Sequence, residues 1–268
     1  MKKRSILGLM LIVVLVAGLF AGCSSNTTKT DDNANNDDKT FVVGLDDSFP
    51  PMGFRDEKNE IVGFDVDLAK EVGKRMGMEV VLQPINWDTK ELELDSGSID
   101  VIWNGLTITD ERKQAMDFTT PYLENDQVIV VKKDSAIKTK ADLAGKNVGV
   151  QKGSSAFDAF TADPISQQAA ALNEYPENVS ALNDLGIGRI DAVVVDSIVA
   201  RYYITSESAE FVILSESLSP ELYGVGIKKG NTELLTQVQD AMDAMVADGT
   251  AATISTKWFG EDIIYKAN

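Results

Sequence analysis

The sequence predicts an α/β protein of two lobes, each built on a mostly parallel sheet with helices on its faces. Strand-like apolar runs alternate with helical patterns from Phe41 onward, which is typical of such sheets. The alternation occurs in two series that echo each other, VVGLDDS at 42–48 against NVGVQKGSS at 147–155. The 268 residues are enough for two small domains. Because the echoes are short, we expect two lobes of similar plan and not a strict repeat.

The N-terminal segment has the pattern of an export signal. Residues 2–4 are Lys-Lys-Arg, and an uncharged, mostly apolar run follows at 6–20. The ending Phe20-Ala21-Gly22-Cys23 resembles the lipobox of bacterial lipoproteins, although Phe20 departs from the aliphatic residue most usual there. This resemblance implies a signal peptide over 1–22 and a lipidated Cys23 as the mature N-terminus. An uncleaved membrane anchor is the alternative, and either would place the folded part outside the membrane.

Residues 23–40 are expected to tether the folded part to the lipid. The stretch 24–40 consists of Ser, Asn, Thr, Asp and Lys with one Ala, so it has almost nothing apolar to bury. Such a composition predicts disorder. A flexible chain of this length would hold the domain roughly 20–25 Å from its anchor.

The first series is expected to open with a buried strand at 41–45, FVVGL, followed by a loop with two prolines at 46–54. Apolar residues at helical spacing predict a helix at 65–76, and Gly97 ends another helix at 90–96. Strands are expected at 79–82 and 99–103.

The second series predicts strands at 127–131, 147–151, 192–196 and 211–214. Helices are expected at 141–144, from Ser155, near 179–185 and from Ser197. A strand at 223–227, an amphipathic helix at 232–246 and a last helix at 250–259 follow. We expect these C-terminal elements to return to the first lobe, so that two crossovers form a hinge. The lobes would then comprise 41–124 with 225–268, and 128–218.

Composition excludes several classes of function. The net charge is −17, and loss of the three cations at 2–4 with the signal peptide would make it −20. Nucleic acid is therefore not an expected partner, because a phosphate backbone requires clustered Lys and Arg. The chain has no His, which removes the commonest general base, the Ser-His and Cys-His nucleophile pairs and most zinc sites. Its single Cys, Cys23, cannot form an internal disulfide.

The segment WNGLTITDER at 103–112 combines a strand end, a loop of small polar residues and a helix start at Thr109. Asp110 and Glu111 fall in the first turn of this expected helix. A helix start collects backbone N–H groups that have no intrahelical partner and carries a partial positive charge. Arg112 adds a two-pronged donor that matches a carboxylate. The segment therefore favours capture of a small carboxylate ligand, with a solvated surface Arg as the alternative.

Other polar residues follow the ends of predicted strands. In open parallel sheets, ligands bind beyond the carboxyl ends of the strands, where loops and helix starts lie. Four polar residues fall at such positions: Asp46, Asn104, Ser154 and Asp196. Two lobes with facing sites would make a cleft.

Several motifs occur in order over roughly 41–259: GLDDSFPPMGF, IVGFDVDLAKEV, GSIDVIWNGLTITDER, MDFTTPY, VGVQKGSS, DAVVVD and the terminal KWFG. With these motifs the chain resembles the extracellular solute-binding proteins of the polar amino-acid family, the receptors of bacterial ABC importers. The resemblance implies the type II fold of periplasmic binding proteins, a free amino acid as ligand and an ABC permease as partner. It also implies a monomer that has no cofactor, metal or catalytic residue.

The resemblance assigns roles to matching positions. Arg112 would clamp the α-carboxylate, helped by Gly105 and Thr107 in the preceding loop, and Asp196 would hold the α-ammonium. The other implied ligand contacts are hydroxyl or amide donors at Ser154 and Ser155, aromatic walls at Phe49 and Trp87, and Asp46 near the ligand side chain or ammonium. Asn104 and Gly105 stand where some relatives have a pair of Ser, so backbone N–H groups would have to replace those hydroxyls.

Each assignment has a structural alternative. Asp196 could be the N-cap of the helix that follows, and the two roles are compatible. Phe49 and Trp87 could be core residues, and Trp103 could belong to the core or to the pocket. The serines at 154 and 155 could simply cap a helix.

Ligand class and function also have alternatives. Asp46 and Asp47 beside aromatic residues favour a cationic or neutral polar side chain, since an acidic one would need a second cation and only Lys152 is nearby. A dehydratase-like enzyme on the same fold would have to use carboxylates such as Glu91 or Glu124. The ligand domain of a membrane sensor is disfavoured, because no apolar run of spanning length follows Phe41.

Overall fold

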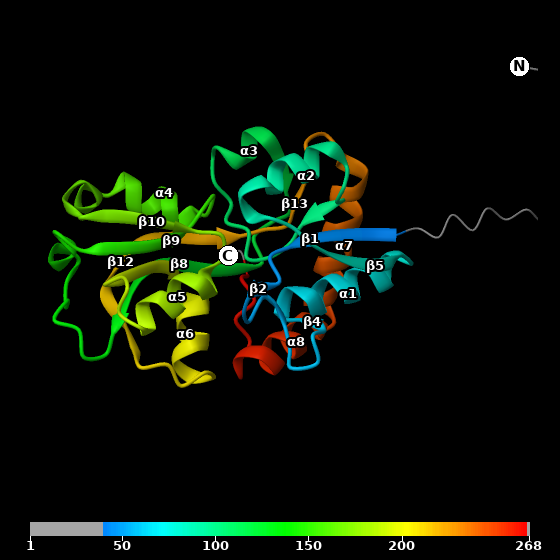
Figure 1. Ribbon diagram of the computed structural model, residues 1–268. Helices are drawn as coiled ribbons and strands as arrows, with labels where there is room; N and C mark the ends of the chain where they lie inside the picture. Colours follow the sequence, from blue (N-terminus) through cyan, green and yellow to red (C-terminus); the bar gives the residue numbers. More distant parts are fainter. Residues whose placement is uncertain (1–39, 267–268) are drawn as a thin grey trace, which may run out of the picture. The chain divides into compact units, whose positions relative to one another are not determined.

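Two five-stranded sheets organise residues 40–266, the part of the chain that this computed structural model describes (Figure 1). The first has the order β5-β1-β6-β13-β7, and we call the part built on it lobe 1. Its strands are β1 (Thr40–Leu45), β5 (Glu79–Pro84), β6 (Val101–Ile102), β7 (Met116–Phe118) and β13 (Gly226–Lys228). Strand β1 is parallel to β5 and β6, whereas β13 is antiparallel to β6 and β7.

The second sheet has the order β10-β9-β11-β8-β12, and the part built on it is lobe 2. Its strands are β8 (Leu123–Lys132), β9 (Asn147–Gln151), β10 (Ala171–Tyr175), β11 (Ala192–Asp196) and β12 (Phe211–Tyr223). Strand β9 is parallel to β10 and β11, and β8 is antiparallel to β11 and β12.

The predicted two-lobed α/β architecture is confirmed. Each sheet is mixed, with four strands in one direction and one strand, β13 in lobe 1 and β8 in lobe 2, antiparallel to both of its neighbours. The parallel neighbours include pairs joined by a helical crossover, as β1 and β5 are joined by α1 (Phe64–Met76). Strands β8, β12 and β13 belong to the segments that pass between the lobes, and these segments pair in the antiparallel sense.

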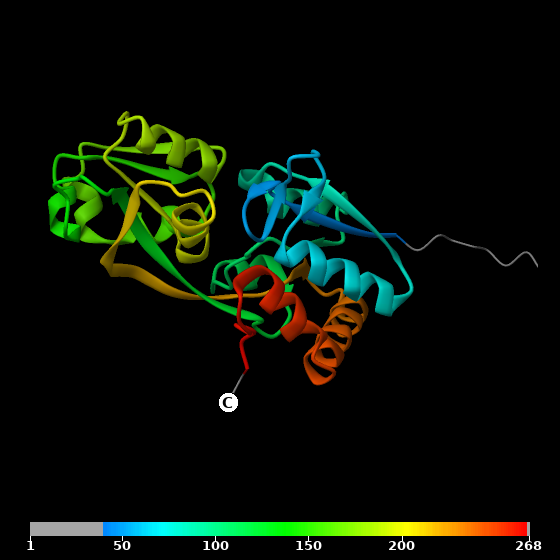
Figure 2. The same ribbon diagram turned by 90° about the horizontal axis from the view of Figure 1, so that it is seen from below.

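Strands β8 and β12 connect the two lobes, and we call them the connecting strands. They pair from Lys132 opposite Phe211 to Leu123 opposite Tyr223, with irregular register between Ile213 and Ser219. Figure 2 shows them side by side between the lobes, in green and yellow to orange. The sequence predicted only 211–214 as strand, because the following SESLSPELY lacks a continuous apolar run. The chain thus crosses between lobes twice.

Helices cover the sheets of both lobes. Lobe 1 carries α1, α2 (Lys90–Ser96), α3 (Arg112–Ala115), α7 (Thr232–Ala247) and α8 (Thr250–Phe259), and lobe 2 carries α4 (Ser155–Ala162), α5 (Asn178–Gly186) and α6 (Ser197–Thr205). The short 3-10 helices are η1 (Trp87–Thr89), η2 (Lys140–Leu143) and η3 (Pro164–Gln168). The expected loop at 46–54 contains most of a small antiparallel sheet of β2 (Ser48–Phe49), β3 (Gly53–Arg55) and β4 (Ile61–Val62).

The C-terminal helices α7 and α8 lie against α1, as Figure 2 shows in orange, red and cyan. Apolar side chains of α1 such as Leu68 and Val72 are buried with Val238 and Met242 of α7 in one core. Full burial of such a side chain contributes roughly 1.5–3 kcal/mol. At the edge of this core the Trp258 indole donates to Asp67 at 2.7 Å.

Within residues 40–266 no helix combines the length and the apolarity that a membrane crossing requires. The predicted signal peptide, Cys23 and nearly all of the predicted tether lie outside the described residues; Thr40 begins β1.

Candidate functional site

A small cavity brings together most of the residues predicted for the site. Its volume is about 10 Å³, which is room for about one water molecule. Its lining consists of seven residues predicted from the sequence and one that was not predicted, Gln151; the seven are Phe49, Trp87, Gly105, Arg112, Ser154, Ser155 and Asp196. The remaining predicted residues, Asp46, Asn104 and Thr107, lie behind this lining and bond to other residues of the site.

Arg112 is the cation of this cavity, and only 8% of its side chain is exposed. The solvated-surface alternative is therefore wrong. Its guanidinium donates to the Thr107 carbonyl at 2.9 Å and to the Gly153 carbonyl of lobe 2 at 3.4 Å. The helix begins at Arg112 and not at Thr109 as expected. Thr109 instead closes the turn before it, because its hydroxyl accepts from the Arg112 N–H at 3.1 Å.

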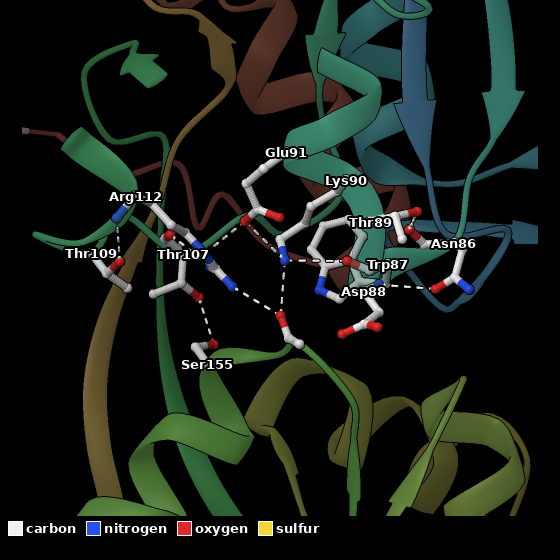
Figure 3. Close-up of polar contacts among 11 residues, drawn as sticks. Asn86, Trp87, Asp88, Thr89, Lys90, Glu91, Thr107, Thr109, Arg112 and Ser155 are labelled. Atoms are coloured by element: carbon white, nitrogen blue, oxygen red, sulfur yellow. Dashed lines mark hydrogen bonds and ion pairs between the residues drawn. The ribbon is translucent and has the colours of Figure 1, made fainter. Parts of the chain in front are cut away.

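Lys90 is a second buried cation beside Arg112, and the sequence analysis missed it. Its ammonium donates to the carbonyls of Gly153 at 2.8 Å and Trp87 at 3.2 Å, and it pairs with Glu91 at 3.1 Å. Figure 3 shows Lys90, Glu91 and Arg112 next to one another, with Ser155 facing Thr107. Burial, followed by repulsion from Arg112, lowers the pKa of Lys90 to about 8. The site therefore has a cationic side.

Asp196 lies at the end of β11 and is the anion of the cavity. One of its oxygens, Oδ1, accepts from the side-chain amides of Asn125 and Gln127, both at 2.7 Å, and from the Tyr223 hydroxyl at 2.6 Å. It is the N-cap residue of α6, as the alternative predicted, but its side chain makes no capping hydrogen bond. Burial and the negative charge of Glu221 raise the pKa of Asp196. Among the described residues, no cation forms an ion pair with it.

Asp46 lies at the end of β1 and bonds directly to the other lobe. Its carboxylate accepts from the Ser48 N–H at 2.9 Å and from the Gln151 side-chain amide at 2.7 Å. Burial raises its pKa to about 6, although both hydrogen bonds act in the opposite direction. A buried carboxylate with only neutral partners favours an incoming cation.

Asn104 and Gly105 shape the site from behind. Asn104 is fully buried and its amide donates to the Asp46 carbonyl at 3.2 Å. Gly105 has φ +57, and a Cβ there would lie 2.9 Å from the Phe49 ring, so the turn requires glycine. Its N–H, expected to be available for a ligand, donates to the buried carboxylate of Asp65 at 2.7 Å. Burial raises the pKa of Asp65 to about 7.

The predicted hydroxyl residues meet between the lobes. Thr107 of lobe 1 and Ser155 of lobe 2 have their oxygens 3.0 Å apart. Ser154 caps α4 by accepting from the Phe157 N–H at 3.1 Å, and its hydroxyl donates to the Gln151 carbonyl at 2.7 Å. The capping alternative therefore holds for Ser154, which also lines the cavity.

Of the aromatic candidates, two line the cavity and one belongs to the hydrophobic core. Phe49 and Trp87 are 5% and 7% exposed and line the cavity, so each is both buried and part of the site. Trp103 is 1% exposed and packs against Tyr122 with ring centroids 6.2 Å apart. It belongs to the core.

The remaining candidates lie at the margin. Lys152, the expected second cation, is half exposed and pairs with Asp88 of lobe 1 at 2.9 Å. Glu91 is held by Lys90, and Glu124 is exposed on a connecting strand. Among residues 40–266 no group of His, Cys, Asp and Glu is arranged to hold a metal ion.

The chain matches the family model of bacterial extracellular solute-binding proteins, family 3, over residues 41–261. It is 36% identical over 266 residues to the L-cystine-binding protein TcyJ of Escherichia coli, with 97% of each chain covered. It is also similar to the crystal structure of an ABC uptake transporter substrate binding protein from Streptococcus pneumoniae with bound histidine. That similarity has a TM-score of 0.82 and 39% identity, covering 85% of this chain and 95% of the other.

An ancestral arginine-binding protein bound to arginine is similar as well, with a TM-score of 0.78 and 42% identity over 82% of this chain and 98% of the other. The family model spans nearly all of the described residues, and one relative is matched over almost its whole length. The chain therefore belongs to family 3 of the bacterial extracellular solute-binding proteins.

Proposed function

We propose that the chain is the extracytoplasmic receptor of an ABC importer and that it binds a free amino acid between its lobes. One observation carries the proposal: a buried Arg of lobe 1 and a buried Asp of lobe 2 line the same cavity. An α-amino acid presents opposite charges a few ångströms apart, so Arg112 would pair with its carboxylate and Asp196 with its ammonium. Either charge would be costly to bury alone. The similar proteins named above bind cystine, histidine and arginine.

A polar or cationic side chain fits the rest of the site best. Asp46 is buried behind the cavity lining, with only neutral partners, among them Gln151 of the lining, which favours a positive or hydrogen-bonding ligand group. For an acidic ligand, both candidate cations already have carboxylate partners, Lys152 with Asp88 and Lys90 with Glu91. Phe49 and Trp87 would wall the side-chain pocket.

Binding would require the lobes to separate and close again. The lobes touch through direct hydrogen bonds, among them Asp46 with Gln151 and Lys90 with Gly153, and the cavity they enclose is too small for an amino acid. The connecting strands β8 and β12 would act as the hinge, since the chain crosses between lobes only there in the described part. Water exclusion on closure would strengthen both charge pairs.

An enzyme on this fold is disfavoured by the family match, because the family consists of solute-binding proteins. Membership also implies a place outside the cytoplasm. A lipid at Cys23 would anchor the chain to the membrane next to the permease that accepts its cargo.

A thermal-shift panel of the common amino acids tests the proposed function. At a thousandfold excess over the dissociation constant, a ligand stabilises the folded state by about 4 kcal/mol, which for this size is roughly 8–16 °C. We expect one or a few polar or cationic amino acids to produce such a shift. If sugars stabilise the protein and no amino acid does, the proposed function is wrong.

A further inference from the structure

Glu221 on connecting strand β12 contacts residues of the proposed site. Its Oε2 accepts from the hydroxyl of Thr107 in lobe 1 at 2.9 Å and lies 3.3 Å from the hydroxyl of Ser155 in lobe 2. The same oxygen accepts from Gln127 at 3.0 Å and Asn125 at 3.3 Å, both on strand β8. One carboxylate oxygen thus contacts both lobes and the opposite connecting strand.

Glu221 also shares its donors with Asp196. The side-chain nitrogens of Asn125 and Gln127 each lie within hydrogen-bonding distance of both carboxylates. Every one of these donors is neutral, and no ion pair in the described part of the chain involves either acid. The charge of Glu221 contributes to the raised pKa of Asp196. Two neighbouring carboxylates without a cation between them repel each other.

We propose that Glu221 is the second carboxylate of the ammonium subsite, so that the α-ammonium of the amino acid is held between Asp196 and Glu221. This inference rests on the proposed function. An ammonium has three N–H donors, and Asp196 alone can accept only part of them. Glu221 supplies a further oxygen that touches Ser155, a residue of the cavity wall. The ligand would thereby supply the cation that this pair of acids lacks.

The surroundings of Glu221 give its carboxylate access to water. Glu221 lines a larger cavity of about 910 Å³ together with Thr107 and Asn125. Glu221 is only partly buried, so water in this cavity can solvate its carboxylate. Asp196 is 4% exposed and has no comparable access. The two acids therefore differ in solvation although they share donors.

Three variants test the inference: Glu221→Gln, its matched control Glu124→Gln and the reference Asp196→Asn. Glu124 lies on the adjacent connecting strand opposite Leu222 and is exposed, so its variant makes the same charge change nearby. Calorimetry would use whichever of L-arginine, L-histidine and L-cystine binds the unmodified protein most tightly, together with the α-deamino analogue of that amino acid. Thermal melts of the ligand-free variants complete the set.

We expect Glu221→Gln to weaken amino-acid binding about 10- to 150-fold, the loss typical of a hydrogen bond to a charged group. Binding of the deamino analogue should change less than about threefold in the same variant, because the analogue has no ammonium to lose a partner. The ligand-free melting temperature should stay the same or rise, because glutamine keeps the length and one acceptor while removing the repulsion with Asp196. Glu124→Gln should leave both affinities unchanged.

Two results would overturn the inference. One is an affinity of Glu221→Gln within threefold of the unmodified protein while Asp196→Asn binds poorly. The other is an equal loss for the amino acid and its deamino analogue together with a lower ligand-free melting temperature, which would show that Glu221 only braces the lobes. If no common amino acid in the thermal-shift panel binds the unmodified protein, the proposed function itself has failed.

Discussion

Replacement of Arg112 by alanine is the most informative single change to the proposed carboxylate subsite. In Arg112→Ala the carboxylate of a bound amino acid would be buried without a cation facing it. Breaking a buried ion pair by removing one partner typically costs about 3–5 kcal/mol, or roughly 10²–10⁴ in affinity. The neighbouring Lys90 already bonds to the Gly153 and Trp87 carbonyls and to Glu91, so we expect it to compensate little.

The fold should survive this change. The Arg112 side chain makes one short hydrogen bond to its own lobe, to the Thr107 carbonyl at 2.9 Å. Its loss costs about 1.5–3 kcal/mol as the usual contribution of a hydrogen bond to a charged group. Lys113→Ala is the matched control, because Lys113 is the next residue and pairs only with exposed Asp110 at 3.2 Å among acidic side chains.

Calorimetry on Arg112→Ala, Arg112→Lys and Lys113→Ala, with circular dichroism as a check on folding, completes the experiment. Arg112→Lys keeps the charge but loses the two-pronged geometry, so it should also bind poorly. Lys113→Ala should bind like the unmodified protein. Near-native affinity in folded Arg112→Ala would mean that another group holds the carboxylate, and the reasoning that assigns it to Arg112 would be refuted.

Three further predictions concern stability, closure and anchoring. Burial raises the pKa of Asp65 to about 7, so the contribution of this group to stability is full below the unfolded pKa of about 4 and is lost as the pH rises through 7. Asp65→Asn should therefore raise the stability at pH 8 by up to about 4 kcal/mol and make the melting temperature depend less on pH between pH 5 and pH 8. An unchanged pH profile of the melting temperature would contradict this. Gly153 has φ +68, and a Cβ there would lie 3.0 Å from the Asp88 backbone of lobe 1, whereas Gly188 has φ +75 and a Cβ there would meet open space. Gly153→Ala and Gly188→Ala should each lose roughly 1–2 kcal/mol of stability, but only Gly153→Ala should bind amino acids less tightly. Equal affinities of the two variants would argue against closure of the lobes at this contact. Cys23→Ser should release the protein from membranes in cell fractionation, and an unchanged membrane fraction would contradict lipidation.

The sequence predicted the site well where one rule applied, namely that ligands bind beyond the carboxyl ends of strands. Asp46 follows β1 of lobe 1 and Asp196 ends β11 of lobe 2, and both lie at the site because the carboxyl ends of these strands in the two sheets meet there. Arg112 was also predicted, although its helix begins three residues later than expected. The local sequence predicts this helix start less accurately than the strand ends, because the Thr109 hydroxyl closes a turn that lies before the helix.

Residues that depend on long-range packing were missed. Lys90 starts the polar-looking helix KELELDS, and one of the carbonyls that accept from its buried ammonium belongs to Gly153, 63 residues later. Glu221 lies in SPELY, which has no strand pattern, and it reaches the site because β12 pairs with β8 far past the predicted end at 214. One signal was present: Gln127 is a polar residue directly before the apolar run VIVV, and polar groups buried beside such a run need partners.

One strand in each sheet runs against the other four, β13 in lobe 1 and β8 in lobe 2, and the sequence did not predict either reversal. Local patterns predict strands and helices, but they do not show which strands belong to the segments that cross between the lobes. Those strands pair antiparallel.

The central claim is that one amino acid lies between the lobes, with its carboxylate on Arg112 and its ammonium on Asp196. A crystal structure of the protein with the amino acid that gives the largest thermal shift tests it most directly. The account predicts the ligand carboxylate within hydrogen-bonding distance, about 2.7–3.2 Å, of the Arg112 guanidinium, and the ammonium at the same distance from Asp196. A ligand bound in the cavity of about 910 Å³ beyond Glu221, or one with its two charged groups reversed, would contradict the account.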